Sequence, residues 1–410
     1  MYKIIFFIML LTQFVYGLVL QLLSNKQVGK PLPKSVADIY NEEEYNRWRS
    51  YNNKKDKLAV FSRALSLIVN IILYCTNVIS IIYYVLPGGE WLKALLFLAI
   101  LGHVDVIVSL PIEYIFNFKI EAEFGFNKVT PKTFISDQIK NFILNILLNV
   151  LIFSLVLGAY ALLGDYFGII AFAGLAVLMF VISAFSSVFS KIFNKFTSLP
   201  EGELRTNLSK MFEEAGYKLK DIYVMDASRR TTKANAYCGG IGKLKQIVLY
   251  DNLVNNYTEG EITAVFAHEL AHFKNKDTTK MTFFNLLNFL PMVLLATACM
   301  VVPEISSSFD FESPSILFAF YASFGGLTSI VTSIIMIPFN YLSRKFERRA
   351  DSLAYEKGYG DDIISALKKL HKDSLSDMNP HPIVVNLTYN HPPLLDRIEL
   401  IEAKKAAENK

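Results

Sequence analysis

The sequence predicts a mainly α-helical, polytopic membrane protein in which seven transmembrane helices carry a smaller α+β unit on one side. Three observations lead to this fold class. Of the 410 residues, 52% are hydrophobic and only 19% are charged, whereas soluble domains carry about 25% charged residues. Seven apolar stretches are each long enough to cross a hydrocarbon core about 30 Å thick as a helix. The segments between them alternate between rich and poor in Lys and Arg.

Composition also excludes several other classes. An apolar content this high cannot stay solvated, so most of the chain is not disordered. The three cysteines, Cys75, Cys238 and Cys299, are far apart and odd in number, which excludes a disulfide scaffold. The formal net charge is +4 and no domain-wide basic face is present, so we expect no nucleic-acid partner.

The predicted spans follow from the lengths of the apolar stretches. They run roughly over Tyr2–Leu23, Leu58–Leu86, Leu92–Phe116, Phe142–Leu163, Phe167–Phe189, Phe283–Val302 and Ser315–Leu342. The first stretch has an alternative interpretation as a signal peptide, because Lys3 stands at its start. We favour a true span, because the run is long for a signal peptide and no small-x-small cleavage site closes it.

Positive charge is distributed unequally between the connecting segments. Those rich in Lys and Arg are residues 24–57, 117–141, 190–282 and 343–410. Those without Lys or Arg are residues 87–91, 164–166 and 303–314. Lys93, just inside the third stretch, is a mild exception. The positive-inside rule therefore predicts an N-terminus on the outer or lumenal side and a cytosolic C-terminus.

The spans and segments predict four regions. They are residues 1–189 with spans one to five and the cytosolic loops 24–57 and 117–141, residues 190–282 as a folded cytosolic unit, residues 283–342 with spans six and seven, and residues 343–410 as cytosolic C-terminal helices. Within 190–282 we expect a helix that Pro200-Glu201-Gly202-Glu203 opens and Gly216 ends, a strand at 221–225 and a hairpin of 233–238 with 246–250. A further helix starts after Thr258, which forms a capping box with Glu261.

The helix after Thr258 contains His268-Glu269-Leu270-Ala271-His272, an HExxH motif. Residues four apart lie on one face of a helix, so both imidazoles can bind one Zn²⁺. Glu269 follows the first histidine and can take a proton from a water at the metal. The alternative is a chance match, because surface helices also carry His and Glu.

A catalytic zinc site needs a third protein ligand, and residues 274–277 supply no third histidine. Glu347 lies just after the last predicted span, on the same side of the membrane as the HExxH helix, and can serve as that ligand. Asp351, one helical turn later, can accept a hydrogen bond from a ligand imidazole and fix its tautomer. The alternative is a solvated face, because four basic residues surround this pair, namely Arg344, Lys345, Arg348 and Arg349.

These motifs together resemble the type I CAAX prenyl endopeptidase family, integral-membrane zinc proteases that process prenylated proteins. The resemblance rests on HExxH, Glu347 with Asp351, Asn235-Ala236-Tyr237, and His391-Pro392-Pro393-Leu394-Leu395-Asp396-Arg397. It extends to residues 194–202 and 121–127, and so covers nearly the whole chain. HExxH alone occurs in many zincins, but this combination on seven spans is much more specific.

The resemblance implies roles for the matching positions. One Zn²⁺ per chain would be held by His268, His272 and Glu347, with Glu269 as general base and Asp351 as support for a ligand. Asn235 would lie on an edge strand that binds the extended substrate. His391 would donate to the oxyanion, and Arg397 would support Glu347 or the substrate.

Two of these residues also have ordinary interpretations. Asn235 could simply shape a turn, and His391 could be a loop residue without a partner. Polar residues occur within the spans, among them Arg63, Asn70, His103 and Asp105. They could join helices to one another, whereas the resemblance implies that they line a chamber enclosed by the seven spans and closed by the zincin-like unit.

The predicted function is a membrane-embedded zinc metalloendopeptidase that removes the C-terminal tripeptide of prenylated CAAX proteins. A first alternative is a membrane quality-control zinc protease of the heat-shock type that acts on unprenylated misfolded proteins. A remote alternative is a seven-span transporter or receptor without enzymatic activity. The expected partners are a prenylated CAAX peptide or protein and the lipid bilayer. The expected location is the endoplasmic reticulum in a eukaryote or the cytoplasmic membrane in a bacterium.

Overall fold

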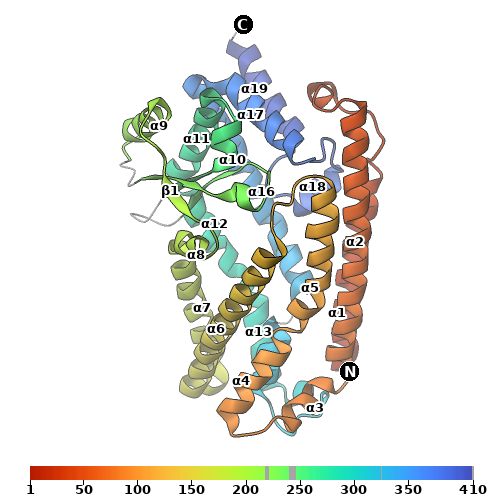
Figure 1. Ribbon diagram of the computed structural model, residues 1–410. Coiled ribbons are helices and arrows are strands. Elements are labelled where there is room, and N and C mark those ends of the chain that lie inside the picture. The colour runs from red at the N-terminus through yellow and green to blue at the C-terminus, as the bar shows by residue number, and fades with distance from the viewer. Residues whose placement is uncertain (218–220, 240–245, 325, 409–410) are drawn as a thin grey trace.

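The computed structural model describes residues 1–217, 221–239, 246–324 and 326–408. Within these ranges the chain is mainly helical, with one small sheet, as predicted. The apolar helices form the lower part of the molecule in Figure 1, and the sheet with the C-terminal helices lies above them.

Six helices of the described chain are long and apolar enough to cross a membrane, and one bent pair makes a seventh. The six spans cover Tyr2–Asn25 (α1), Glu42–Cys75 (α2), Leu92–Glu121, Pro131–Leu163 (α6), Phe167–Ala184 (α7) and Asp277–Val301. Leu92–Glu121 covers most of α4 (Glu90–Leu101) and all of α5 (Val104–Ile115), and Asp277–Val301 contains α12 (Asp277–Asn285) and α13 (Phe289–Val301). The bent pair is α15 (Ile316–Phe324) and α16 (Ser329–Ala354), which meet at 48°.

The second predicted span differs in detail from the structure. Helix α2 begins at Glu42, where Asn41 and Glu44 form a capping box, and its polar first part precedes the apolar stretch. The helix ends at Cys75, and a separate helix α3 covers Val78–Val85. The break falls at Asn77, whose side chain hydrogen-bonds with Lys3 and Asp310 at this end of the molecule. The helix therefore ends inside the apolar stretch, because Thr76 has an extended backbone and Asn77 is held by these polar contacts.

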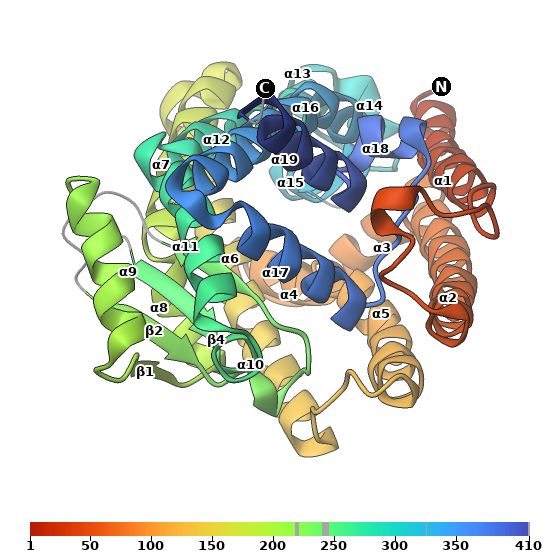
Figure 2. The ribbon, with the colours of Figure 1, turned by 90° about the horizontal axis from the view of Figure 1, so that it is seen from above.

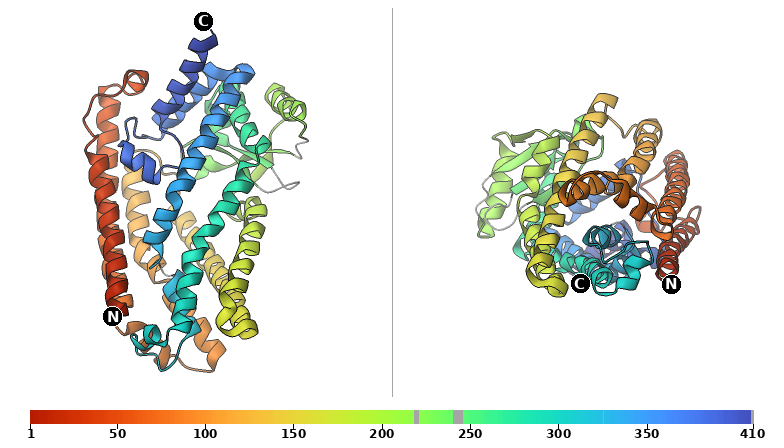
Figure 3. Two further views of the ribbon diagram at one scale, coloured as in Figure 1. Left: turned by 180° about the vertical axis from the view of Figure 1, so that it is seen from behind. Right: turned by 90° about the horizontal axis from the view of Figure 1, so that it is seen from below.

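The apolar helices are arranged as a ring. Helices α1 and α2 pack side by side on one flank, and α6 and α7 pack together on the opposite flank (Figure 1). Viewed from above, α4 and α5 join these flanks on one side, and α13, α15 and α16 join them on the other (Figure 2). The views from behind and below in Figure 3 show the same arrangement.

Some of the polar residues predicted in the spans share a cavity inside this ring. Arg63, Asn70 and Asp105 line a space of about 340 Å³ between α1, α2, α5 and α16. His103, which precedes α5, is 1% exposed, and its Nδ1 lies 3.1 Å from the carbonyl oxygen of Ala99 in α4. Ionisable groups at membrane depth are costly and face partners or water rather than lipid, and these positions agree with that expectation.

The segment between the fifth and sixth spans forms a sheet of four strands in the order β1-β2-β4-β3. They are β1 (Phe196–Ser198), β2 (Ile222–Met225), β3 (Ala236–Gly239) and β4 (Gln246–Tyr250). β2 and β4 are parallel, and the other two pairs are antiparallel. The predicted strand at 221–225 and the predicted hairpin are therefore confirmed, although the hairpin turn lies outside the described residues. The three-residue β1 was not predicted, because so short a strand has no recognisable alternation.

Helix α11 (Glu259–Lys274) lies across this unit and carries the HExxH motif. The predicted capping box is present, since Thr258 Oγ1 accepts from the backbone of Glu261 and the Glu261 carboxylate accepts from the backbone of Thr258. The helix is buried along most of its length and packs against α16, α9 (Glu203–Glu214) and α17 (Gly360–Asp373). The remaining helices are α8 (Ser186–Phe193), α10 (Asp251–Asn256), α14 (Pro303–Ser307), α18 (Pro382–Thr388) and α19 (Leu394–Glu408).

Candidate metal centre

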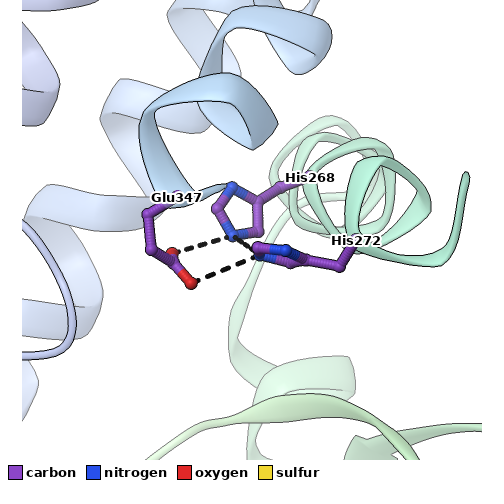
Figure 4. Close-up of side chains that lie close together, drawn as sticks. All are labelled: His268, His272 and Glu347. Atoms are coloured by element: carbon purple, nitrogen blue, oxygen red, sulfur yellow. Dashed lines mark hydrogen bonds and ion pairs between the residues drawn. The ribbon is translucent and has the colours of Figure 1, made fainter. Parts of the chain in front are cut away.

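Two helices bring together three side chains that can hold a metal ion. His268 and His272 project from α11, and Glu347 projects toward them from α16 (Figure 4). The Nε2 atoms of the two histidines lie 3.2 Å apart. His268 Nε2 is 3.2 Å from Glu347 Oε2, and His272 Nε2 is 3.3 Å from Glu347 Oε1. All three potential ligand atoms lie within 4.8 Å of one another.

Each histidine forms a hydrogen bond with an aspartate through its Nδ1, on the side of the ring away from the centre. His268 Nδ1 lies 2.9 Å from Asp351 Oδ1, and His272 Nδ1 lies 3.1 Å from Asp277 Oδ2. Both carboxylates are almost completely buried, at 0% and 3% exposure. A carboxylate at Nδ1 accepts its proton, so the lone pair of the neutral ring is on Nε2, which points into the centre.

Asp277 was not recognised as part of the site from the sequence. It begins α12, directly after α11, and Lys276 between the two helices has φ 54°. The left-handed backbone of this residue interrupts the helix, and the side chain of Asp277 contacts His272 across the break. The only local signal was an acid five residues beyond the second histidine, which by itself is common at a helix start.

An arginine binds each of the two aspartates. Arg397 from α19 donates to Asp351 through Nε at 2.8 Å and through Nη2 at 2.6 Å. Arg349 Nη2 donates to Asp277 Oδ1 at 2.5 Å. Such charge-assisted contacts, bidentate at Asp351, restrict the carboxylate orientation and thereby the imidazole orientation. Arg349 was also not predicted as a site residue; it had been interpreted only as part of a basic surface run.

The chemistry of these donors fits a metal cation. With Nδ1 protonated on both rings, two nitrogen lone pairs and a carboxylate face each other at 3.2–3.3 Å. Glu347 Oε2 is buried and accepts no hydrogen bond of good geometry from a described residue. Burial lowers the pKa of His272, but the hydrogen bonds with Asp277 and Glu347 outweigh it and raise this pKa to about 10. The site therefore favours a positive charge at its centre, which a divalent metal ion supplies.

The other predicted site residues surround this centre. Glu269 is half-buried on α11, and its charge acts on both His272 and Arg397. His391 Nδ1 lies 3.0 Å from Glu347 Oε2, and its side chain is 60% exposed. Arg397, 7% exposed, lies 4.0 Å from Glu347 Oε2 in addition to its contacts with Asp351.

Asn235 lies at the start of the outermost strand of the sheet. It directly precedes β3, which pairs with β4 on one side and, among the described strands, has no strand on the other. The Asn235 carbonyl accepts the N–H of Tyr250 at 3.0 Å, and its Oδ1 accepts the N–H of Ala236 at 2.9 Å. Strand β3 also contacts α11. The free edge of the sheet therefore runs beside the helix that carries both histidines.

Comparison with known proteins agrees with this fold and site. Residues 21–195 match the family model "CAAX prenyl protease N-terminal, five membrane helices", and residues 198–405 match "Peptidase family M48". The CAAX prenyl protease 1 homolog of Arabidopsis thaliana is 30% identical over 392 residues, which is 91% of each chain. CAAX prenyl protease 1 of Saccharomyces cerevisiae is 28% identical over 404 residues, covering 90% of this chain and 88% of its own.

A solved structure is similar over almost the full length. The crystal structure of S. mikatae Ste24p superposes with a TM-score of 0.90 at 27% identity, covering 98% of this chain and 99% of that one. The fold and the His–His–Glu centre therefore define a multi-pass membrane zinc metalloendopeptidase. Within this class, the chain belongs to the CAAX prenyl protease 1 (Ste24) family, M48 peptidases with an N-terminal membrane domain. The family resemblance of the sequence is thus confirmed.

The role of Asp277 can be measured through metal affinity. We expect Asp277→Ala to weaken metal binding about 10- to 100-fold, because His272 loses the partner that fixes its tautomer and orientation. Chelator competition on the purified full-length protein measures this affinity directly. Asp38→Ala is a suitable control, because that side chain is 64% exposed and pairs with Lys368, which is not a residue of the centre. An affinity unchanged from wild type would show that His272 does not depend on Asp277.

Proposed function

We propose that this chain binds one Zn²⁺ through His268, His272 and Glu347 and removes the C-terminal tripeptide of prenylated CAAX proteins. The observation that carries the proposal is the buried His–His–Glu centre on a fold that matches Ste24p over its full length. The relatives named above are CAAX prenyl proteases, and the site offers the same class of chemistry.

The residues around the centre suggest how a peptide bond is hydrolysed. When bound, Zn²⁺ supplies a Lewis acid that polarises the peptide carbonyl and lowers the pKa of water. Glu269 takes the proton of the attacking water and passes it to the leaving amine. His391 donates a hydrogen bond to the oxyanion that develops on the carbonyl oxygen. The partly exposed position of His391, close to Glu347, suits a donor that must reach a substrate.

The remaining predicted residues position the substrate and the ligands. Asn235 and the free edge of β3 bind the extended peptide by strand addition, which needs no particular side chains in the substrate. Asp351 fixes the imidazole of His268. Arg397 donates to Asp351 and lies close to Glu347, and it thereby holds both carboxylates in place beside the bound substrate.

A membrane location suits a prenylated substrate. A prenyl chain is apolar and stays in or near the bilayer, while the peptide attached to it must reach the metal. The ring of helices and the polar cavity between them support a chamber that connects these two environments. This substrate class therefore explains why the residues of the metal centre are attached to membrane helices and do not form a separate soluble domain.

A comparison of peptides tests the substrate proposal. Purified, zinc-loaded protein is expected to cleave a farnesylated CAAX peptide after the modified cysteine and to release a tripeptide, identified by mass spectrometry. The same peptide without the prenyl group serves as the control and should be cleaved poorly. Degradation of unprenylated casein by a protein that leaves the farnesylated peptide intact would instead support the quality-control protease.

Glu269→Gln tests the proposed base. The amide keeps the shape of the side chain but cannot accept the proton, so we expect kcat to fall about 10²- to 10⁴-fold. Metal content should remain at the wild-type level, because Glu269 is not among the ligands. Full activity in a metal-replete Glu269→Gln variant would remove Glu269 from the mechanism.

We further propose that the N-terminus lies outside or in a lumen and the C-terminus in the cytosol, in the reticulum of a eukaryote or the cytoplasmic membrane of a bacterium. The alternation of Lys and Arg between the connections supports this orientation. Single cysteines placed at Ser307 and at Glu399, in a variant without native cysteines, are expected to react with an impermeant maleimide from opposite sides of sealed vesicles. Labelling of both from one side would contradict the orientation.

A further inference from the structure

A cavity of about 450 Å³ lies directly beside the metal centre. His391 is one of its lining residues, together with Tyr51 and Lys55 of α2, Lys233 before β3, and Leu394 at the start of α19. Because His391 Nδ1 lies 3.0 Å from Glu347 Oε2, the cavity adjoins the centre itself. A peptide that leaves the metal on this side enters the cavity.

Two lysines meet in this cavity, and only one of them has an ionic partner. Lys233 Nζ lies 3.0 and 3.3 Å from the two carboxylate oxygens of Glu121, which also accepts the hydroxyl of Tyr51. The Lys55 ammonium lies 4.8 Å from the centre of the Tyr51 ring and forms no ion pair with a described residue. The charge of Lys233 repels that of Lys55, and the more weakly acting charges of Asp56 and Glu121 attract it from beyond ion-pair distance. A half-buried ammonium without a carboxylate is costly, so this position calls for an anion.

The acidic residues of the cavity are engaged elsewhere. Asp377 accepts the backbone N–H of Asn379 at 3.0 Å. Asp56 follows Lys55 on α2 and therefore points about 100° away from it around the helix axis. Its carboxylate forms a hydrogen bond with the Gln21 side chain and feels the charges of both Lys55 and Arg63, but no ion pair with Lys55 is formed. Neither acid takes the place of a counterion within ion-pair distance of Lys55.

The position of Lys233 just before the sheet edge indicates what the anion can be. Lys233 precedes Asn235 by two residues, so both belong to the segment that leads into the free edge of β3. A peptide paired with that edge advances about 3.3 Å per residue, which places a carboxylate three residues beyond the scissile bond about 10 Å from the metal. A free C-terminal α-carboxyl group has an ordinary pKa of about 3.3–3.7 and is ionised at neutral pH.

We propose that Lys55 binds the α-carboxylate of the substrate. Lys233, which pairs with Glu121, lines the same cavity. This inference rests on the proposed function and adds to it a residue that recognises the C-terminus of the substrate. A charge-assisted contact of this kind would distinguish a CAAX terminus from the same sequence inside a longer chain.

Two peptides and three proteins test the inference. The peptides are a farnesylated CAAX sequence with a free carboxylate and the same peptide with a C-terminal amide. Wild-type protein is expected to prefer the carboxylate about 10- to 150-fold in kcat/KM, the range for a hydrogen bond to a charged group. Lys55→Met should lose this preference by slowing only the carboxylate peptide. Lys57→Met, at an exposed position on the same helix, should behave as wild type.

The outcomes separate the two proposals. Equal cleavage of both peptides by wild type, or a preference that survives in Lys55→Met, overturns the role of Lys55 and leaves the proposed function standing. Failure of wild type to cleave either peptide overturns both. Lys55→Arg keeps the positive charge and is expected to keep the preference. An unchanged unfolding temperature of Lys55→Met shows that its effect does not come from misfolding.

Discussion

The centre depends on the buried ion pair between Arg397 and Asp351. Together with His268, this pair joins three helices that are far apart in the sequence, namely α11, α16 and α19. Its groups are nearly inaccessible to solvent, and removal of one partner from such a pair costs about 3–5 kcal/mol because the other charge is left buried. The same contact fixes the rotation of α16 about its axis. Glu347, one turn before Asp351, therefore faces the two histidines.

A second contact of the same kind fixes the other histidine. Asp277 and Arg349 hold His272 as Asp351 and Arg397 hold His268, and Arg349 stands on α16 two residues after Glu347. Helix α16 thus contributes the potential ligand Glu347. It also contributes Asp351, which contacts His268, and Arg349, which contacts the aspartate beside His272. The site is preorganised because its ligands cannot rotate independently. A metal ion that enters it meets two nitrogen lone pairs and a carboxylate already in position.

The sequence predicts those parts of the site that have a local pattern. The HExxH spacing, the capping box at Thr258 and the hairpin strands were all recognised, because each depends on residues close together in the chain. Asp277 was missed because its return to His272 depends on the left-handed backbone of Lys276, which no residue type there indicates. The contact of Arg397 with Asp351 spans 46 residues and depends on how the helices pack. The break of the second span at Asn77 likewise depends on tertiary partners.

The membrane helices and the protease unit are joined by contacts that also shape the site. The loop after α5 pairs with the segment before β3, through the bridge of Asn127 with Thr231 and the bond from Lys128 N–H to the Arg230 carbonyl at 3.0 Å. Arg230 also pairs with Asp137 on α6. The sheet edge beside the metal is therefore attached to the spans on both sides of that loop. An extended peptide that pairs with this edge would therefore lie at a fixed height relative to the membrane helices, which limits the bonds that can reach the centre.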